Sequence, residues 1–162
     1  MRRVLRSIYT LPVFMTLGRA LFAMSRLPRL EPLSLWLARS YARLVVFAHG
    51  ERRYVSPEDL AGEWNRLMPR PRSAFPVVRT DGDTAFAEIH VKCPLRGSND
   101  PEACWRSMEF DRALMQRAGG RLVVLESQSV TGGTCCKVAI RPRGADVSDL
   151  SVAHPRWHSP EK

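Results

Sequence analysis

Apolar residues recur at helical spacing in the first half of the chain and at alternating positions in the second half. Between Pro32 and Phe47 the large residues repeat every three or four positions, which predicts an amphipathic helix whose apolar stripe faces a core or an interface. That stripe consists of Leu33, Trp36, Leu37, Ser40, Leu44 and Phe47. Pro32 suits a first helical turn and Gly50 a helix end, so both ends are marked.

Another helix is predicted from residue 57 to residue 68. Ser56 is a favourable N-cap, Pro57 fits the first helical position, and acidic residues follow in the first turn. Segment 69–76 is rich in Pro and Arg and has the composition of a linker. We therefore expect a boundary there between a helical N-terminal part and a β-rich C-terminal part.

After this linker, apolar residues occur at every second position instead of at helical spacing. Asp81-Gly82-Asp83 indicates a turn, and apolar and polar residues then alternate, as they do in a half-buried strand. The expected elements are strands at 84–92, 122–128 and 135–141, a helix at 100–118 and a hairpin loop at 130–134. The sequence thus predicts an α+β fold, in which N-terminal helices precede a β-α-β-β antiparallel sheet with helices on one face.

Charge divides the chain into an arm, a domain and a tail. Residues 1–50 carry eight Arg and one Glu, whereas residues 51–162 carry 17 basic and 15 acidic residues. We therefore expect a basic helical arm at 1–50, an α+β domain at 51–142 and a loose polar tail at 143–162. A charge of +7 confined to the arm indicates contact with an anionic surface.

The first 24 residues have three interpretations. Arg2, Arg3 and Arg6 precede an uncharged run of 12 residues, which is shorter than the roughly 20 needed to span a bilayer. The segment packs on its own domain, docks on a membrane surface or protein assembly, or is a cleaved signal, although no clear cleavage site follows. Nucleic acid is disfavoured as a partner because Arg alternates with large aliphatic residues and no nucleic-acid-binding module is visible.

All four cysteines lie within residues 90–141, which makes this stretch the candidate site. Cys93 ends a predicted strand, and Cys104 falls in the first turn of the next helix, where the helix dipole would lower its pKa. Cys135 and Cys136 point to opposite faces of their strand, so only one of them can join a shared site. The alternative is that the cysteines are small buried core residues.

Three further features extend the candidate site. Asp111 lies two helical turns after Cys104 on the same face. The turn Arg96-Gly97-Ser98-Asn99 would offer backbone N–H groups near the thiol, forming an anion pocket. Glu88 and His90 share one strand face, so the carboxylate can orient the imidazole as a general base; a solvated outer face is the alternative.

The candidate metal ligands do not have the spacing of a standard zinc motif. Ten residues separate Cys93 from Cys104, which exceeds the usual spacing of paired zinc cysteines. A site formed by Cys93, Cys104, Cys136 and His90 stays open, and otherwise no cofactor is expected. The chain has no P-loop, Rossmann glycine pattern, G-x-S-x-G or H-E-x-x-H motif.

The C-terminal half resembles a known family. The resemblance rests on a strand ending in Cys93-Pro94, a helix carrying Cys104 and Asp111, and a Gly132-Gly133 turn before Cys136-Lys-Val-Ala-Ile. Over residues 84–141 these features resemble the L-2-amino-thiazoline-4-carboxylic acid hydrolase-like family. The resemblance implies a sheet-and-helix domain with paired cysteines and an acid. It also implies ring-opening hydrolysis of small sulfur heterocycles, or binding of small molecules.

Two functions follow as hypotheses. The first is a hydrolase acting on carbon–nitrogen bonds of small cyclic substrates, with Cys104 as nucleophile or ligand, Cys93 and Asp111 in support, and His90 as base. The second is a non-enzymatic accessory protein that docks on a membrane or a larger assembly through residues 1–47. The cysteine usage predicts a reduced, cytoplasmic protein, which the second hypothesis places at the inner face of a membrane.

Overall fold

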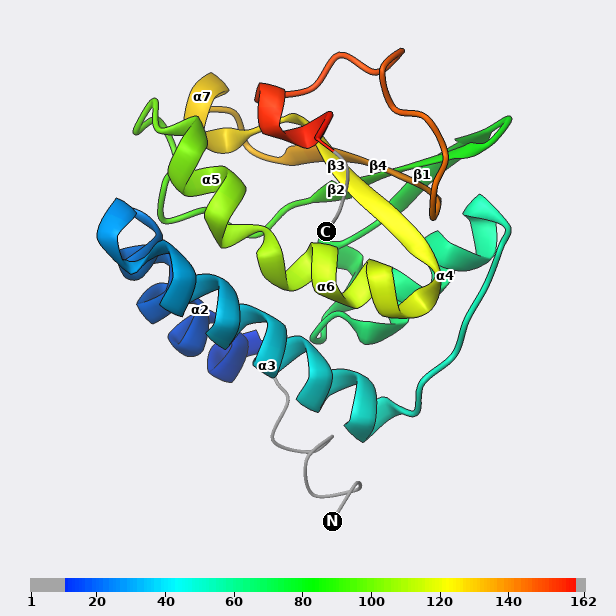
Figure 1. Cartoon of the computed structure of the whole chain (residues 1–162), viewed down its shortest axis with the longest axis horizontal. Helices are drawn as coiled ribbons and strands as arrows, with labels where there is room; N and C mark the ends of the chain where they lie inside the picture. The colour runs from blue at the N-terminus through cyan, green and yellow to red at the C-terminus, as the bar shows by residue number, and fades with distance from the viewer. Residues whose placement is uncertain (1–10, 160–162) are drawn as a thin grey trace.

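An antiparallel sheet forms one layer of the computed structural model, which describes residues 11–159 (Figure 1). Its strands run in the order β1-β2-β4-β3. They are β1 (Val77–Asp81), β2 (Thr84–Ile89), β3 (Gly120–Glu126) and β4 (Cys136–Pro142). The predicted α+β class is confirmed.

The first strand, β1, was not predicted from the sequence. Asp81 pairs with Thr84, so β1 and β2 form a hairpin around the predicted turn, in which Gly82 takes a φ of 55°. A positive φ of this kind is readily adopted by glycine. The domain therefore runs β-β-α-β-β rather than β-α-β-β, and the segment assigned as a linker leads directly into the sheet.

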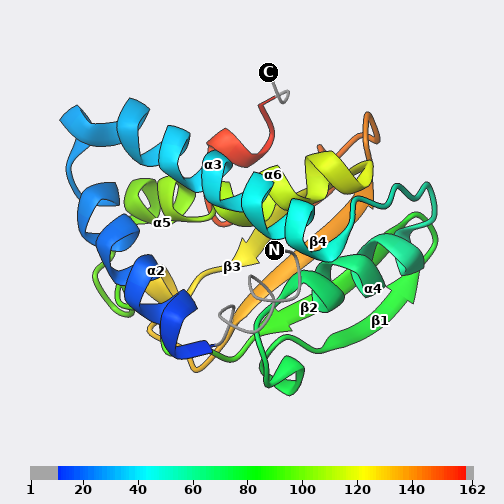
Figure 2. The ribbon, with the colours of Figure 1, turned by 90° about the horizontal axis from the view of Figure 1, so that it is seen from below.

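Helices cover one face of this sheet (Figures 1 and 2). They are α2 (Leu11–Ser25), α3 (Glu31–His49), α4 (Pro57–Leu67), α5 (Pro101–Ser107), α6 (Glu109–Ala118) and the short α7 (Gln128–Thr131). Helix α4 packs on β2 and β4, α6 packs on β3, and α3 lies over α6. The single helix expected at 100–118 is divided at Met108, between α5 and α6.

The core lies between the sheet and α4 and α6. Leu60, Trp64, Leu114, Leu122 and Ile140 are fully buried there. Burying a large apolar side chain contributes about 1.5–3 kcal/mol, so this layer holds the sheet and helices together. Alternating residues of β2 and β4 supply its sheet side, as the period of two predicted.

Helix α3 turns its small residues inward and its large residues outward. Ala38, Ala42 and Val45 are buried, whereas Trp36 and Leu44 are exposed. Of the two alternatives for the stripe of large residues, a core or an interface, the core is therefore excluded for Trp36 and Leu44. Small side chains let α3 approach α6 closely, so the arm shares the hydrophobic core of the domain.

The C-terminal segment wraps around the β3 edge of the sheet. Arg141 binds Asp149, the Ala153 N–H donates to the Val124 carbonyl oxygen at 2.9 Å, and Trp157 is buried against the Arg112 guanidinium. The prediction of a loose tail is thus wrong for residues 143–159, because these contacts fix the segment against β4, β3 and α6.

The basic start of the arm, with Arg2, Arg3 and Arg6, lies outside the described residues. Helix α2 spans Leu11–Ser25, so Pro12 lies in its first turn. Among the described helices none combines the length and apolar character needed to cross a membrane.

Candidate functional site

Three cysteines meet on the wall of one pocket between α2, α5, α6 and the sheet. Cys93 follows β2, Cys104 lies in α5, and Cys136 begins β4. The cavity volume is about 80 Å³. Most of the remaining lining is apolar: Leu21, Phe22, Tyr41, Phe75, Ile89, Val91, Met108 and Phe110.

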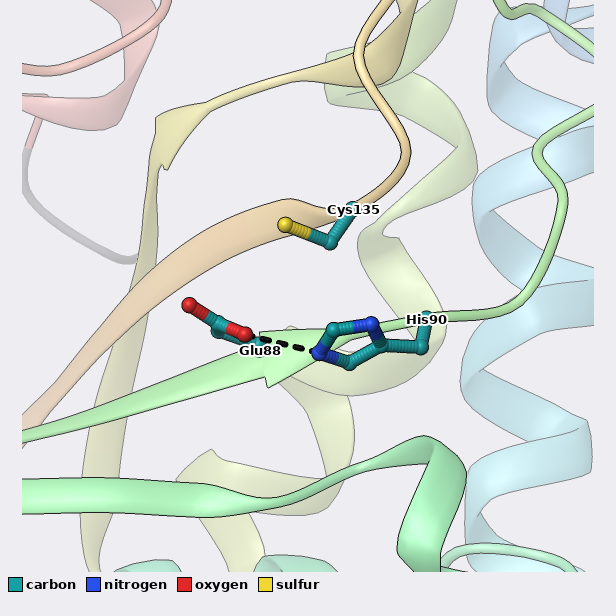
Figure 3. Close-up of side chains that lie close together, drawn as sticks. All are labelled: Glu88, His90 and Cys135. Carbon is teal, nitrogen blue, oxygen red and sulfur yellow. Dashed lines mark hydrogen bonds and ion pairs between the residues drawn. The ribbon is translucent and has the colours of Figure 1, made fainter.

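The local structure explains why these thiols converge. Alternation along β2 and its extension brings Ile89, Val91 and Cys93 to the pocket. Alternation also separates the adjacent cysteines, because Cys136 lines the pocket while Cys135 lies with the outer-face residues Glu88 and His90 (Figure 3). The prediction that only one of the two joins the cluster is confirmed.

Gln128 ties two of the pocket cysteines together. Its side-chain oxygen accepts from the Cys93 N–H at 3.1 Å, its side-chain amide donates to the Val91 carbonyl at 2.9 Å, and its backbone N–H donates to the Cys136 sulfur at 3.4 Å. Gln128 is fully buried and was missed by the sequence analysis. A polar Ser-Gln-Ser triplet directly after an apolar strand was the available signal.

Two serines hold the Cys104 thiol. The Cys104 sulfur lies 3.0 Å from the Ser127 hydroxyl oxygen, which lies 2.9 Å from the Ser129 hydroxyl oxygen. All three residues are buried. Hydroxyl groups donate as well as accept hydrogen bonds. The Ser127 and Ser129 hydroxyls can therefore stabilise the Cys104 thiolate once a base removes the thiol proton.

Burial, rather than the helix dipole, is the main influence on the pKa values of the pocket thiols. It raises the pKa of Cys104 and Cys93, and it raises the pKa of Cys136 to about 11. The prediction of a lowered Cys104 pKa is therefore wrong, because the apolar surroundings disfavour the charged form more than the hydrogen bonds favour it. The resting thiols are protonated at neutral pH.

Asp111 provides an unusual buried carboxyl group beside them. It lines the same pocket, and the Trp64 indole N–H donates to its Oδ1 at 2.9 Å. Desolvation raises the pKa of Asp111 to about 6, although the Trp64 hydrogen bond and the nearby Arg112 charge oppose the rise. A carboxyl group with this pKa can exchange a proton near neutral pH.

His90 does not belong to this pocket. Its Nε2 lies 2.7 Å from Glu88 Oε2, so the predicted pairing is present, but neither residue lines the cavity (Figure 3). The alternation of β2 puts both side chains on the opposite face of the sheet. His90 therefore does not serve as the base for Cys104, and Glu88 is not a binding residue of the pocket.

The turn at residues 96–99 does not provide the predicted anion pocket. The N–H groups of Arg96, Gly97, Ser98 and Asn99 all donate to backbone carbonyl oxygens at 2.8–3.1 Å. None of the four residues lines the cavity. The turn instead anchors the chain between Cys93 and α5.

The predicted metal set is not assembled either. No three of Cys93, Cys104, Cys136 and His90 bring their ligand atoms within 4.8 Å of one another. The group in the described part of the chain that meets this condition is Glu88, His90 and Cys135.

Comparison of the chain with protein-family models, curated proteins and solved structures gives no match. The interpretation of the pocket therefore rests on its own chemistry.

Proposed function

We propose that the protein is a hydrolase-like protein that binds a small cyclic molecule in the cysteine-lined pocket and cleaves a carbon–nitrogen bond in it. The convergence of Cys93, Cys104, Cys136 and Asp111 on one apolar cavity carries this proposal. An apolar pocket with a few convergent polar groups, one of them with a perturbed pKa, has the character of a small-molecule site.

Cys104 is the nucleophile in this proposal, and Asp111 is the acid and base. The Asp111 carboxylate takes the thiol proton, and the sulfur attacks the electrophilic carbon of the substrate. The carbon–nitrogen bond breaks, and the leaving nitrogen takes that proton. Water then displaces sulfur from carbon and returns a proton to Cys104. The Ser127 hydroxyl stabilises the transient Cys104 thiolate by a hydrogen bond.

The lining indicates the class of substrate. Lys92 and Asp111 are the charged residues of the pocket, and Lys92 is largely exposed. The remaining apolar surface favours a neutral ring over a zwitterion, because an unpaired charge is costly to bury. A volume of about 80 Å³ accommodates only a small molecule unless α2 shifts.

The test is turnover of a panel of small neutral cyclic amides, imines and thiazolines, followed as the mass gain of one water. We expect Cys104→Ser and Asp111→Asn each to lower turnover at least about 100-fold. Cys135→Ser is the matched control and should retain activity, since Cys135 lies outside the pocket. Full activity in Cys104→Ser would contradict the proposal.

A second function is supported by a different surface, the exposed stripe on α3. We propose that this stripe docks on an anionic bilayer. Trp36 is 61% exposed, and Leu33, Leu44 and Phe47 are each more than 40% exposed. Arg43 is also exposed on this helix, whereas the half-exposed Arg39 side chain pairs with Glu109. Large apolar residues beside arginines are typical of helices that lie in the membrane interface.

Vesicles containing phosphatidylcholine and phosphatidylglycerol test this docking directly. Binding should shift the emission of Trp36 to shorter wavelength, and Leu44→Asp should weaken cosedimentation at least about tenfold because it adds a negative charge to the stripe. Val55→Asp is the control, since Val55 is an exposed apolar residue outside α3. Equal binding by both variants, or no binding by the native protein, would refute membrane docking.

A further inference from the structure

A cluster of metal-ligand side chains lies on the outer face of the sheet, away from the cysteine-lined pocket. Glu88, His90 and Cys135 bring a carboxylate oxygen, an imidazole nitrogen and a sulfur within 4.8 Å of one another (Figure 3). We propose that these three residues bind a zinc ion, with a fourth coordination position open to water.

The backbone sets the positions of the three side chains. Ile89 pairs with Cys136 in the antiparallel β2–β4 ladder, so the next residues outward, His90 and Cys135, face each other across the two strands. Glu88 precedes His90 by two residues and shares its face of the sheet. Glu88 thus lies in β2, while His90 and Cys135 lie one residue beyond the paired ends of β2 and β4, whose register the ladder fixes.

Neighbouring hydrogen bonds restrain the same positions further. The Glu88 N–H donates to the Pro76 carbonyl oxygen at 2.9 Å, and the His90 N–H donates to the Ala74 carbonyl oxygen at 2.8 Å. These bonds hold the end of β2 between β4 and the chain at 74–76. Zinc binding therefore requires little ordering of the backbone, which lowers its entropic cost.

The side chains need only a small adjustment to take up an ion. His90 Nε2 and Glu88 Oε2 lie 2.7 Å apart as a hydrogen-bonded pair. Around a tetrahedral zinc ion with bonds of about 2.0–2.1 Å, two such ligand atoms stand about 3.3 Å apart. Rotation of the exposed His90 side chain and the partly exposed Glu88 side chain on a fixed backbone covers this difference.

The donor set selects the metal. Imidazole nitrogen, thiolate sulfur and carboxylate oxygen together match zinc, whereas calcium and magnesium prefer oxygen ligands alone. The Glu88 carboxylate and the Cys135 thiolate, formed by loss of the thiol proton, balance the two charges of the ion. Nearby Lys137 opposes binding little, because its ammonium group pairs with Glu126 at 2.9 Å.

Isothermal titration of the full-length protein with zinc chloride in metal-free, reducing buffer tests this site. We expect one ion per chain, and at least a tenfold weaker affinity in Cys135→Ser and in His90→Ala, on the order of the loss caused by disturbing a metal site. Cys93→Ser is the matched control, because Cys93 lies in the pocket, and its affinity should equal that of the native protein.

Cobalt provides a second readout, which reports directly whether a thiolate is among the metal ligands. The native protein and Cys93→Ser should show thiolate-to-cobalt charge-transfer absorption, and Cys135→Ser should lack it. Circular dichroism establishes that each variant is folded. Absence of zinc binding would overturn the proposal, as would binding that Cys93→Ser weakens more than Cys135→Ser does.

Discussion

Replacing Asp111 by Asn should make the protein more stable while lowering the turnover that we propose for the pocket. The Asp111 carboxyl group is buried, and its pKa rises from the usual 3.8 to about 6. At a pH above both pKa values, a pKa difference of about 2 between the folded and unfolded protein lowers the free energy of unfolding by about 3 kcal/mol. Asn carries no charge, and its side-chain oxygen can still accept the hydrogen bond from Trp64. We therefore expect Asp111→Asn to stabilise the protein by up to about 3 kcal/mol at pH 7.5.

The sign of the pH dependence follows from the same two values. The folded protein binds the Asp111 proton more tightly than the unfolded chain does, so this group lowers the stability as pH rises from 3.8 toward about 6. The advantage of Asp111→Asn should therefore shrink to less than about 1 kcal/mol at pH 4. Other carboxyl groups titrate in both proteins, and their contributions cancel in the comparison.

Urea unfolding of both proteins at pH 4 and at pH 7.5 measures this difference. Glu58→Gln is the control, because Glu58 is an exposed carboxyl group of α4, and its substitution should change the stability by less than about 0.5 kcal/mol. If Asp111→Asn were no more stable than the native protein at pH 7.5, or if its advantage did not depend on pH, the reasoning would be refuted. A confirmed gain would show that the native protein keeps a destabilising charge in the pocket, as expected of a functional group.

Two further predictions concern the packing of the domain, and both are measured by urea unfolding. Gly119→Ala should cost at least about 2 kcal/mol, because φ is 93° and the new Cβ would stand 2.7 Å from the Tyr54 carbonyl oxygen. Gly132→Ala, at φ 66° with open space around it, should cost only about 1 kcal/mol, and equal costs would contradict the steric argument. Trp157→Ala should cost about 3–5 kcal/mol, since the side chain is buried against Arg112; a negligible loss would mean that the C-terminal segment does not pack as described.

The sequence predicted the elements of the fold better than their packing. Helix ends at Ser56 and Gly50 and the turn at Gly82 were visible because the local backbone demands those residue types. Helix α3 was harder, because its small residues and its large residues both recur at helical spacing. Periodicity identifies the faces of a helix, and only the approach of α6 decides which face is buried.

The candidate site was predictable in part for the same reason. Alternation along β2 and its extension places Cys93 and His90 on opposite faces, which argues against the predicted grouping of His90 with the pocket cysteines. The contribution of Cys136 required the long-range pairing of β2 with β4. The raised Cys104 pKa also depends on neighbours distant in sequence, since burial outweighs the helix dipole.

Thiol labelling of the folded protein tests the central claim, that small molecules reach the cysteines of the pocket. The native protein is treated with methyl methanethiosulfonate, which transfers a small group, or with a polyethylene glycol maleimide, and the modified cysteines are mapped by mass spectrometry. We predict that the small reagent labels Cys93 and Cys104 in the folded protein, whereas the bulky reagent labels only Cys135. If Cys93 and Cys104 reacted with neither reagent until the protein was unfolded, they would lie in a closed core, and the proposed small-molecule function would be contradicted.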